Sequence, residues 1–186
     1  RHPRLAWAPP SAASDVYKRQ DGSDGCTLRG LAINRFTNPG IYIAAGADGN
    51  TIAGNFIGTD TTGTVDLGNT VHGVSIYSNS NTIGGTVAAD RNILSGNHNS
   101  GVRLTTASAT NNLVIGNFIG TDVSGTVDLG NANAGVVLDA GANNNTIGGT
   151  TAAERNLISG NDTSGVRFGG SGTSNNILQG NYIGTD

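Results

Sequence analysis

Short runs of alternating apolar and polar residues divide most of the chain into regular segments. Five segments begin with glycine and carry two apolar residues around a variable position, for example GVSI from Gly73 and GVRL from Gly101. Each is followed by asparagine and a second apolar pair, such as NTI from Asn81. Alternation with period two between Gly, Asn, Ser and Thr is typical of short strands joined by tight turns. The apolar spacing of an amphipathic helix is absent, so the pattern predicts an all-β protein.

The pattern repeats with a long period. The stretch GNFIGTD occupies residues 54–60, returns unchanged at 116–122, and returns as GNYIGTD at 180–186. Two kinds of insert alternate between the strands: TDxxGTVDLG from Thr59 and Thr121, and GTxAAxR from Gly85 and Gly149. Removal of the inserts leaves a unit of about 22–24 residues, which predicts one coil of a solenoid.

Repetition of this kind has a physical reason in a solenoid. Each coil lays its strands over those of the coil below at a spacing of about 4.8 Å, so matching positions stack on one another. We therefore expect the apolar residues to form an interior, with Ile119 among them. Asparagines at matching turns are expected to stack into hydrogen-bonded ladders, as identical Asn side chains do in cross-β arrays.

The motif GΦxΦ…NxIxGNxIG, where Φ is apolar, resembles the coil repeat of right-handed parallel β-helix proteins, the pectate-lyase-like solenoids. It is similar in particular to tandem coils of secreted or surface bacterial proteins, and the resemblance covers about residues 27–186. It implies a right-handed parallel β-helix of about five to six coils, truncated at both ends. Uncapped coils expose strand edges and apolar residues, so we expect the fragment to self-associate through its ends.

Composition agrees with a thin, extended core. The chain has 30 glycines and no methionine, and we count 23 asparagines. Residues 1–20 contain the single Trp, the single Lys and three of the four prolines, and residues 11–20 resemble a translated sequencing adapter. We therefore interpret residues 1–20 as an artefact or a disordered arm, and residues 21–186 as the β-helix domain.

Charge limits the classes of partner. Residues 21–186 contain six Arg, no Lys and twelve acidic residues, a net charge of 6 − 12 = −6. Nucleic acids and anionic membrane surfaces require a basic footprint. Since no apolar run approaches the roughly 20 residues of a membrane-spanning helix, we expect neither nucleic-acid binding nor membrane insertion. The single Cys26 excludes an internal disulfide framework.

The inserts carry the first group of candidate site residues. Asp60 and Asp66 lie on one predicted loop, and Asp122 and Asp128 on its repeat. Oxygen-rich loops bind Ca²⁺, but the EF-hand spacing is absent, and aspartate at a turn more often bonds its own downstream backbone. A solvated capped loop is the preferred interpretation, and Ca²⁺ is the alternative cofactor; no other metal or cofactor is expected. With two coils between them, the loops are expected to project about 10 Å apart.

Outward-facing strand positions carry the second group. Arg103 and Arg167 occupy the variable position of their strands and are expected to point outward, where Arg can hold a uronic acid carboxylate. A solvated strand face is the simpler alternative. His72 and His98 break the repeat, as do Tyr77 and Asp139, but an isolated His is usually exposed. The strand-motif aromatics are expected mostly in core stacks: Tyr42, Phe56, Phe118, Phe168 and Tyr182.

The resemblance predicts the fold but not the activity, because proteins with this fold include lyases, hydrolases, epimerases, adhesins and spacers. Polygalacturonase-like members use clustered aspartates with a His and a basic residue, and pectate-lyase-like members use a Ca²⁺-binding acidic cluster with a basic residue. Neither set maps onto this chain, so no catalytic residue is assigned. We expect a secreted or cell-surface scaffold or interaction module that binds glycans, with Arg103, Arg167 and His72 as glycan contacts. The alternative is a fragment of a polysaccharide lyase or glycoside hydrolase.

Overall fold

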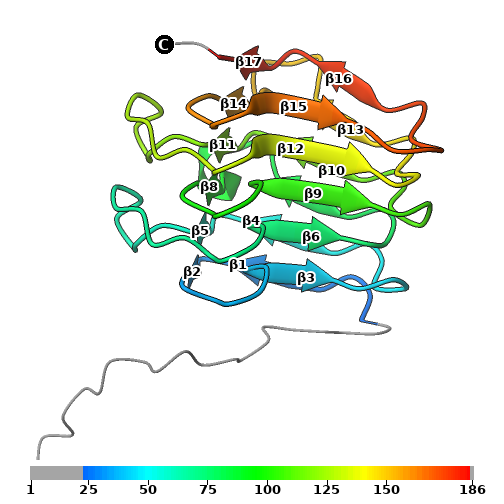
Figure 1. The fold of residues 1–186 in the computed structure, drawn as a ribbon, viewed down its shortest axis with the longest axis horizontal. Coiled ribbons are helices and arrows are strands. Elements are labelled where there is room, and N and C mark those ends of the chain that lie inside the picture. Colours follow the sequence, from blue (N-terminus) through cyan, green and yellow to red (C-terminus); the bar gives the residue numbers. More distant parts are fainter. Residues whose placement is uncertain (1–22, 185–186) are drawn as a thin grey trace, which may run out of the picture.

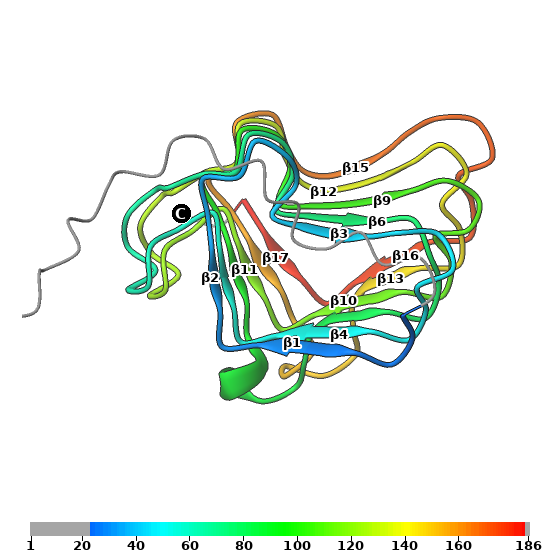
Figure 2. The same cartoon turned by 90° about the horizontal axis from the view of Figure 1, so that it is seen from below.

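The computed structural model describes residues 23–184, so the expectation for residues 1–20 lies outside the described part. The chain winds into a stack of coils in which strands recur at three positions (Figures 1 and 2). All strand pairings between coils are parallel, and the single helical element within residues 23–184 is the 3₁₀ turn η1 (Ala88–Asp90). The predicted parallel β-helix is confirmed.

Three sheets form the sides of the stack. Sheet A contains β1 (Thr27–Arg29), β4 (Thr51–Ala53), β7 (Thr82–Gly84), β10 (Leu113–Ile115), β13 (Thr146–Gly148) and β16 (Ile177–Gln179). Sheet B contains β2 (Ala32–Ile33), β5 (Phe56–Ile57), β8 (Ile93–Leu94), β11 (Phe118–Ile119), β14 (Leu157–Ile158) and β17 (Tyr182–Ile183). Sheet C contains β3 (Ile41–Ile43), β6 (Val74–Ile76), β9 (Val102–Thr105), β12 (Ala134–Asp139) and β15 (Ser164–Phe168). The described residues thus form five coils with all three strands and a sixth with two.

Coil length follows the inserts. The first coil, which has no insert, places Cys26 and Asn50 in contact 24 positions apart. The next three equivalent steps are 31, 31 and 33 residues. One insert lies between sheets B and C in the second and fourth coils, and the other between sheets A and B in the third and fifth. The chain therefore varies its corners while the strand register is kept.

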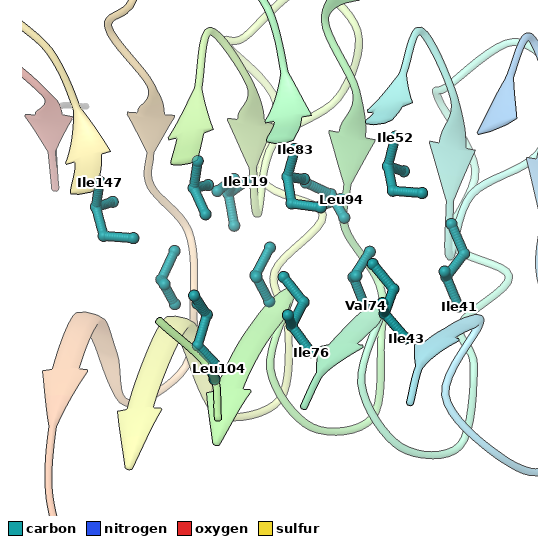
Figure 3. Close-up of a cluster of buried hydrophobic side chains, with 14 of the residues drawn as sticks. Ile41, Ile43, Ile52, Val74, Ile76, Ile83, Leu94, Leu104, Ile119 and Ile147 are labelled. Carbon is teal, nitrogen blue, oxygen red and sulfur yellow. The ribbon is translucent and has the colours of Figure 1, made fainter. Parts of the chain in front are cut away.

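The core is a set of stacked apolar columns (Figure 3). Ile119 is fully buried between Leu94 and Ile158, as expected. In each sheet C strand a glycine precedes the apolar pair, because the corner beside the core leaves no room for a side chain. A Cβ at Gly101 would lie 2.8 Å from Cγ2 of Ile119 and 2.9 Å from the carbonyl oxygen of Gly135. A larger residue at this corner would push the coil away from its neighbour.

Asparagine ladders follow all three corners, as the sequence predicts. In each ladder, the Asn Nδ2 of one coil donates to the Asn Oδ1 of the next at 2.8–3.1 Å. The ladders are Asn50–Asn81–Asn112–Asn145–Asn176, Asn55–Asn92–Asn117–Asn156–Asn181 and Asn69–Asn97–Asn131–Asn161. Most members are buried, so they satisfy turn carbonyls and amides that water does not reach.

The end of the stack at β15, β16 and β17 exposes apolar side chains that are interior positions in the other coils. Phe168 is 45% exposed, Leu178 39% and Ile183 42%. Their counterparts one coil earlier are fully buried: Leu138, Ile147 and Ile158. Self-association through such an end stays a prediction. Among the described residues, no helix has the length and apolar character needed to cross a bilayer.

Candidate functional site

The outer face of sheet C carries the candidate glycan contacts. Strand register places five outward positions in one column: Tyr42, Ser75, Arg103, Val137 and Arg167. The two arginines therefore point outward, as the alternation predicts. They do not form a continuous basic row, because Val137 lies between them and is 1% exposed.

Arg103 is committed to an ion pair with the next coil. Its Nε lies 3.3 and 3.1 Å from Oδ1 and Oδ2 of Asp139, and its Nη2 lies 2.9 Å from Oδ2. Both side chains are partly buried, at 31% and 20% exposure. Fork-like contact of a guanidinium with a carboxylate combines charge with fixed geometry. Arg103 therefore holds Asp139 in place and is not a free cation.

Arg167 lines an open hollow of about 670 Å³ with the far end of β12 and the turn after β15. The other lining residues are Asp139, Ala140, Gly169, Gly170 and Ser171. Within residues 23–184, Arg167 is exposed and makes no ion pair. The hollow thus offers one unpaired guanidinium, a carboxylate already neutralised by Arg103, and glycine backbone that allows close approach.

Asp139 lines the hollow beside Arg167 but was not among the site residues predicted from the sequence. Tyr77, Thr105 and Gly169 hold the equivalent place in other coils, since Asp139 pairs with Thr105 and Gly169 follows Phe168. The sequence did contain an indication of its role. Coil stacking does not require a charge that occurs in only one coil, so an aspartate at this position points to another function.

His72 is buried, which corrects the expectation of an exposed side chain. It is 6% exposed, and its Nδ1 accepts a hydrogen bond from the backbone amide of Ser100 at 3.3 Å. Burial, followed by the positive charge of Arg103, lowers the pKa of His72 to about 4, although Asp139 acts in the opposite direction. The imidazole is therefore neutral at pH 7. His98, by contrast, is exposed.

The four insert aspartates organise their own loops. Asp60 Oδ1 accepts hydrogen bonds from the amides of Thr64 and Val65, and its Oδ2 accepts one from the Thr62 hydroxyl at 2.7 Å. Asp66 Oδ1 accepts the amide of Gly68.

The second loop repeats this arrangement. Asp122 Oδ1 accepts from the amides of Ser124, Thr126 and Val127 and from the Ser124 hydroxyl at 2.6 Å. Asp128 Oδ1 accepts the amide of Gly130. The predicted capping role therefore describes both loops.

These hydrogen bonds stabilise the ionised carboxylates. The hydroxyl of Thr62 and the amides of Thr64 and Val65 lower the pKa of Asp60 to about 2, against a smaller opposing effect of burial. Burial is the largest single effect on Asp122 and raises its pKa. The hydrogen bonds from Ser124, Val127 and Thr126 together outweigh it and leave the pKa below its ordinary value.

We expect Thr62→Val to raise the pKa of Asp60 from about 2 toward its ordinary value of 3.8, because it removes the largest stabilising contact. A folded-state pKa below the unfolded value stabilises the loop above the unfolded pKa, and this stabilisation is lost as pH falls through about 2. A carboxyl ¹³C NMR titration measures the midpoint for both forms. Ser80→Ala, at another exposed hydroxyl, serves as the control, and an unchanged midpoint in Thr62→Val would contradict the assignment.

No three His, Cys, Asp or Glu side chains within residues 23–184 gather closely enough to hold a metal ion. A Ca²⁺ ion on either loop would compete with backbone amides for the carboxylate oxygens described above. Ca²⁺ requires six or more oxygen ligands, so each loop would have to rearrange to bind it.

The two loops lie against each other, which corrects the expected separation. The amide of Val123 donates to the carbonyl oxygen of Gly63 at 3.0 Å, although a coil without this insert lies between them. Both loops extend along the outer side of sheet B (Figure 2). A Cβ at Gly63 would meet the Phe56 ring, and one at Gly125 would meet Phe118. The loops therefore pack against aromatic rings.

The strand aromatics face outward in four of five cases, contrary to the expected core stacks. Phe56, Phe118 and Tyr182 share one register column of sheet B, and the adjacent residues Ile57, Ile119 and Ile183 occupy the interior column. Tyr42 lies outward on sheet C, where its ring centroid is 4.9 Å from that of Tyr77. Phe168 alone occupies an interior position, at the exposed end.

Comparison with known proteins is informative at the level of the fold. No family model matches the chain, and no curated protein matches it significantly in sequence. Among solved structures, the chain is similar to a crystal structure of a mutant of the periplasmic alginate epimerase AlgG, with a TM-score of 0.56 and 16% sequence identity. The match covers 86% of this chain and 40% of that chain. The chain therefore shares a parallel β-helix architecture with AlgG and spans less than half of its length.

Proposed function

We propose that the protein is an exported β-helix module, secreted or held at the cell surface, that binds an acidic polysaccharide on the outer face of sheet C. The observation that carries this proposal is the hollow beside Arg167, where an unpaired guanidinium lies next to the fixed Arg103–Asp139 pair. The carboxylate of a uronate is a suitable partner for such a guanidinium. An extended polymer also suits a face on which equivalent positions recur in every coil.

The similarity to AlgG supports the ligand class and the location. AlgG is described as a periplasmic alginate epimerase, and alginate is a polymer of uronic acids. Its fold therefore accommodates an acidic polysaccharide in an exported protein. The protein is acidic overall, but in this hollow Arg103 neutralises Asp139 and Arg167 is available to bind. An acidic polymer is therefore not repelled at this place.

We expect Arg167→Gln to weaken binding of polygalacturonate at least tenfold, because a charge-assisted contact is lost. Isothermal titration calorimetry with polygalacturonate, alginate and neutral dextran measures the effect. Arg35→Gln is the matched control, because it removes the same charge from another exposed position. Equal affinity of the wild-type protein for dextran, or unchanged affinity of Arg167→Gln, would contradict the proposal.

A second function, a fragment of a polysaccharide-modifying enzyme, is favoured by one observation. The chain is similar in fold to a protein described as an alginate epimerase, an enzyme that acts on a polysaccharide. Release of reducing or unsaturated ends from the same polymers identifies lyase or hydrolase activity. Binding without such release supports the scaffold function.

A further inference from the structure

A second hollow lies on the outer face of sheet B, separate from the hollow beside Arg167. It measures about 230 Å³ and lies between the η1 corner and the tip of the second insert loop. Its lining residues are Gly54, Phe56, Ala88, Ala89, Arg91, Ile93 and Val123. Phe56 and Ile93 are register neighbours on the outer face, and Val123 of the insert loop also lines the hollow. The result is a small apolar groove with a cation at its edge.

The guanidinium of Arg91 lines this groove and lies over an aromatic ring. Its guanidinium carbon lies 4.0 Å from the centroid of the Phe118 ring. Its Nε is buried and has no hydrogen-bond acceptor among the described residues. A buried donor without an acceptor is costly in a folded protein, and the Nε of Arg91 gains an acceptor only if the side chain adjusts as a ligand binds to the guanidinium.

The repeat provides an internal comparison. Arg155 occupies the equivalent place two coils later, with its guanidinium 4.2 Å from the ring centroid of Tyr182. Its Nε donates to the carbonyl oxygen of Gly180 at 2.9 Å, and its Nη1 donates to the Tyr182 hydroxyl at 2.7 Å. Phe118 lacks the hydroxyl that Tyr182 provides to Nη1 of Arg155. The Nε of Arg155 has an acceptor in the chain, whereas the Nε of Arg91 has none among residues 23–184.

Local charge favours an anion in the groove. Arg29 pairs with Asp90 at the same corner, and Arg29 Nη2 also donates to the carbonyl oxygen of Ala89 at 3.2 Å. Asp90 is therefore already neutralised, and Arg91 contributes an uncompensated positive charge. An acidic protein thus presents a local positive site against apolar walls.

We propose that this groove binds a uronate residue, with its carboxylate on Arg91 and the apolar face of its ring against Phe56 and Val123. A volume of about 230 Å³ lies below the roughly 300 Å³ at which pockets for drug-sized ligands begin, so one sugar ring is the appropriate size. Arginine suits a planar carboxylate, and the aromatic and aliphatic walls suit C–H groups. The proposal is independent of sheet C.

Protein-observed NMR titration with sodium galacturonate tests the proposal. We expect dose-dependent chemical-shift changes of the amides of Gly54, Ala89 and Val123. The affinity derived from them is expected to fall at least tenfold in Arg91→Gln and to be unchanged in Arg155→Gln. Arg91→Lys is a second variant, expected to keep the charge, retain the fold and lose most of the affinity, because the planar fork is absent. Thermal unfolding of each variant confirms that the fold is intact.

The ligand series identifies the chemistry of the site. Galactose, which lacks the carboxylate, and acetate, which lacks the ring, are both expected to cause much smaller shifts than galacturonate. Equal shifts with galactose or acetate, no dose-dependent shift with galacturonate, or unchanged shifts in Arg91→Gln would overturn the proposal. Shifts at Gly169, Gly170 and Ser171 that disappear in Arg167→Gln report the sheet C site, so failure at one face is distinguishable from failure at the other.

Discussion

Ile119→Asp is expected to lower the free energy of unfolding by about 4 kcal/mol or more, because it places an unpaired carboxylate in a dry column. Ile119 is fully buried, with Leu94 and Ile158 as its register neighbours and the corner at Gly101 beside it. The nearby ladder donors are already used by backbone carbonyls, since Asn131 Nδ2 donates to the carbonyl oxygen of Leu94 and Asn161 Nδ2 to that of Ile119. Chemical denaturation monitored by circular dichroism measures the loss.

Leu113→Asp is the matched control for this substitution. Leu113 lies in the same coil, on the outer face of β10, and is 40% exposed between Thr82 and Thr146. A carboxylate there remains in water, so the change in stability is expected within about 0.5 kcal/mol. Similar destabilisation by the two substitutions would mean that the inward and outward assignment of the strands is wrong.

Asn117→Ala is expected to cost about 3 kcal/mol, because Asn117 is fully buried in the middle of its ladder. Its Nδ2 donates to the carbonyl oxygens of Ile83 and Ile115 and to Oδ1 of Asn156, at 2.8–3.1 Å. Its Oδ1 accepts from the backbone amide and the Nδ2 of Asn92. Alanine leaves these buried groups with fewer partners, and thermal or chemical unfolding reports the cost.

Two further variants separate hydrogen bonding from packing at this position. Asn117→Asp keeps the size of the side chain but removes the donors, so it is expected to destabilise the protein at least as much as Asn117→Ala at pH 7. Asn38→Ala, in an exposed loop, is the control and is expected to change stability little. A small loss for Asn117→Ala, comparable to that of Asn38→Ala, would show that the ladder contributes order but little stability.

The sequence alone predicted the features that depend on one coil matching the next. The strands of the GΦxΦ type, the asparagine ladders and the interior position of Ile119 follow from repetition, because stacking in register places identical positions above one another. The capping role of Asp60 and Asp122 was also predictable, since an aspartate bonds to amides within a few residues of its own position.

Tertiary structure decided the features that depend on corners and on contacts between coils. The strands of sheet B are two residues long, and in pairs such as Phe118–Ile119 both side chains are apolar, so alternation cannot show which one faces the core. The register of the coils places phenylalanine in the outer column and isoleucine in the buried one. The pairing of Arg103 with Asp139 joins residues 36 positions apart, and the contact between the two loops spans an intervening coil. The repeat thus determined how the coils stack, whereas both candidate binding sites depend on side chains from different coils that meet in space, such as Asp139 with Arg103 and Val123 with Phe56.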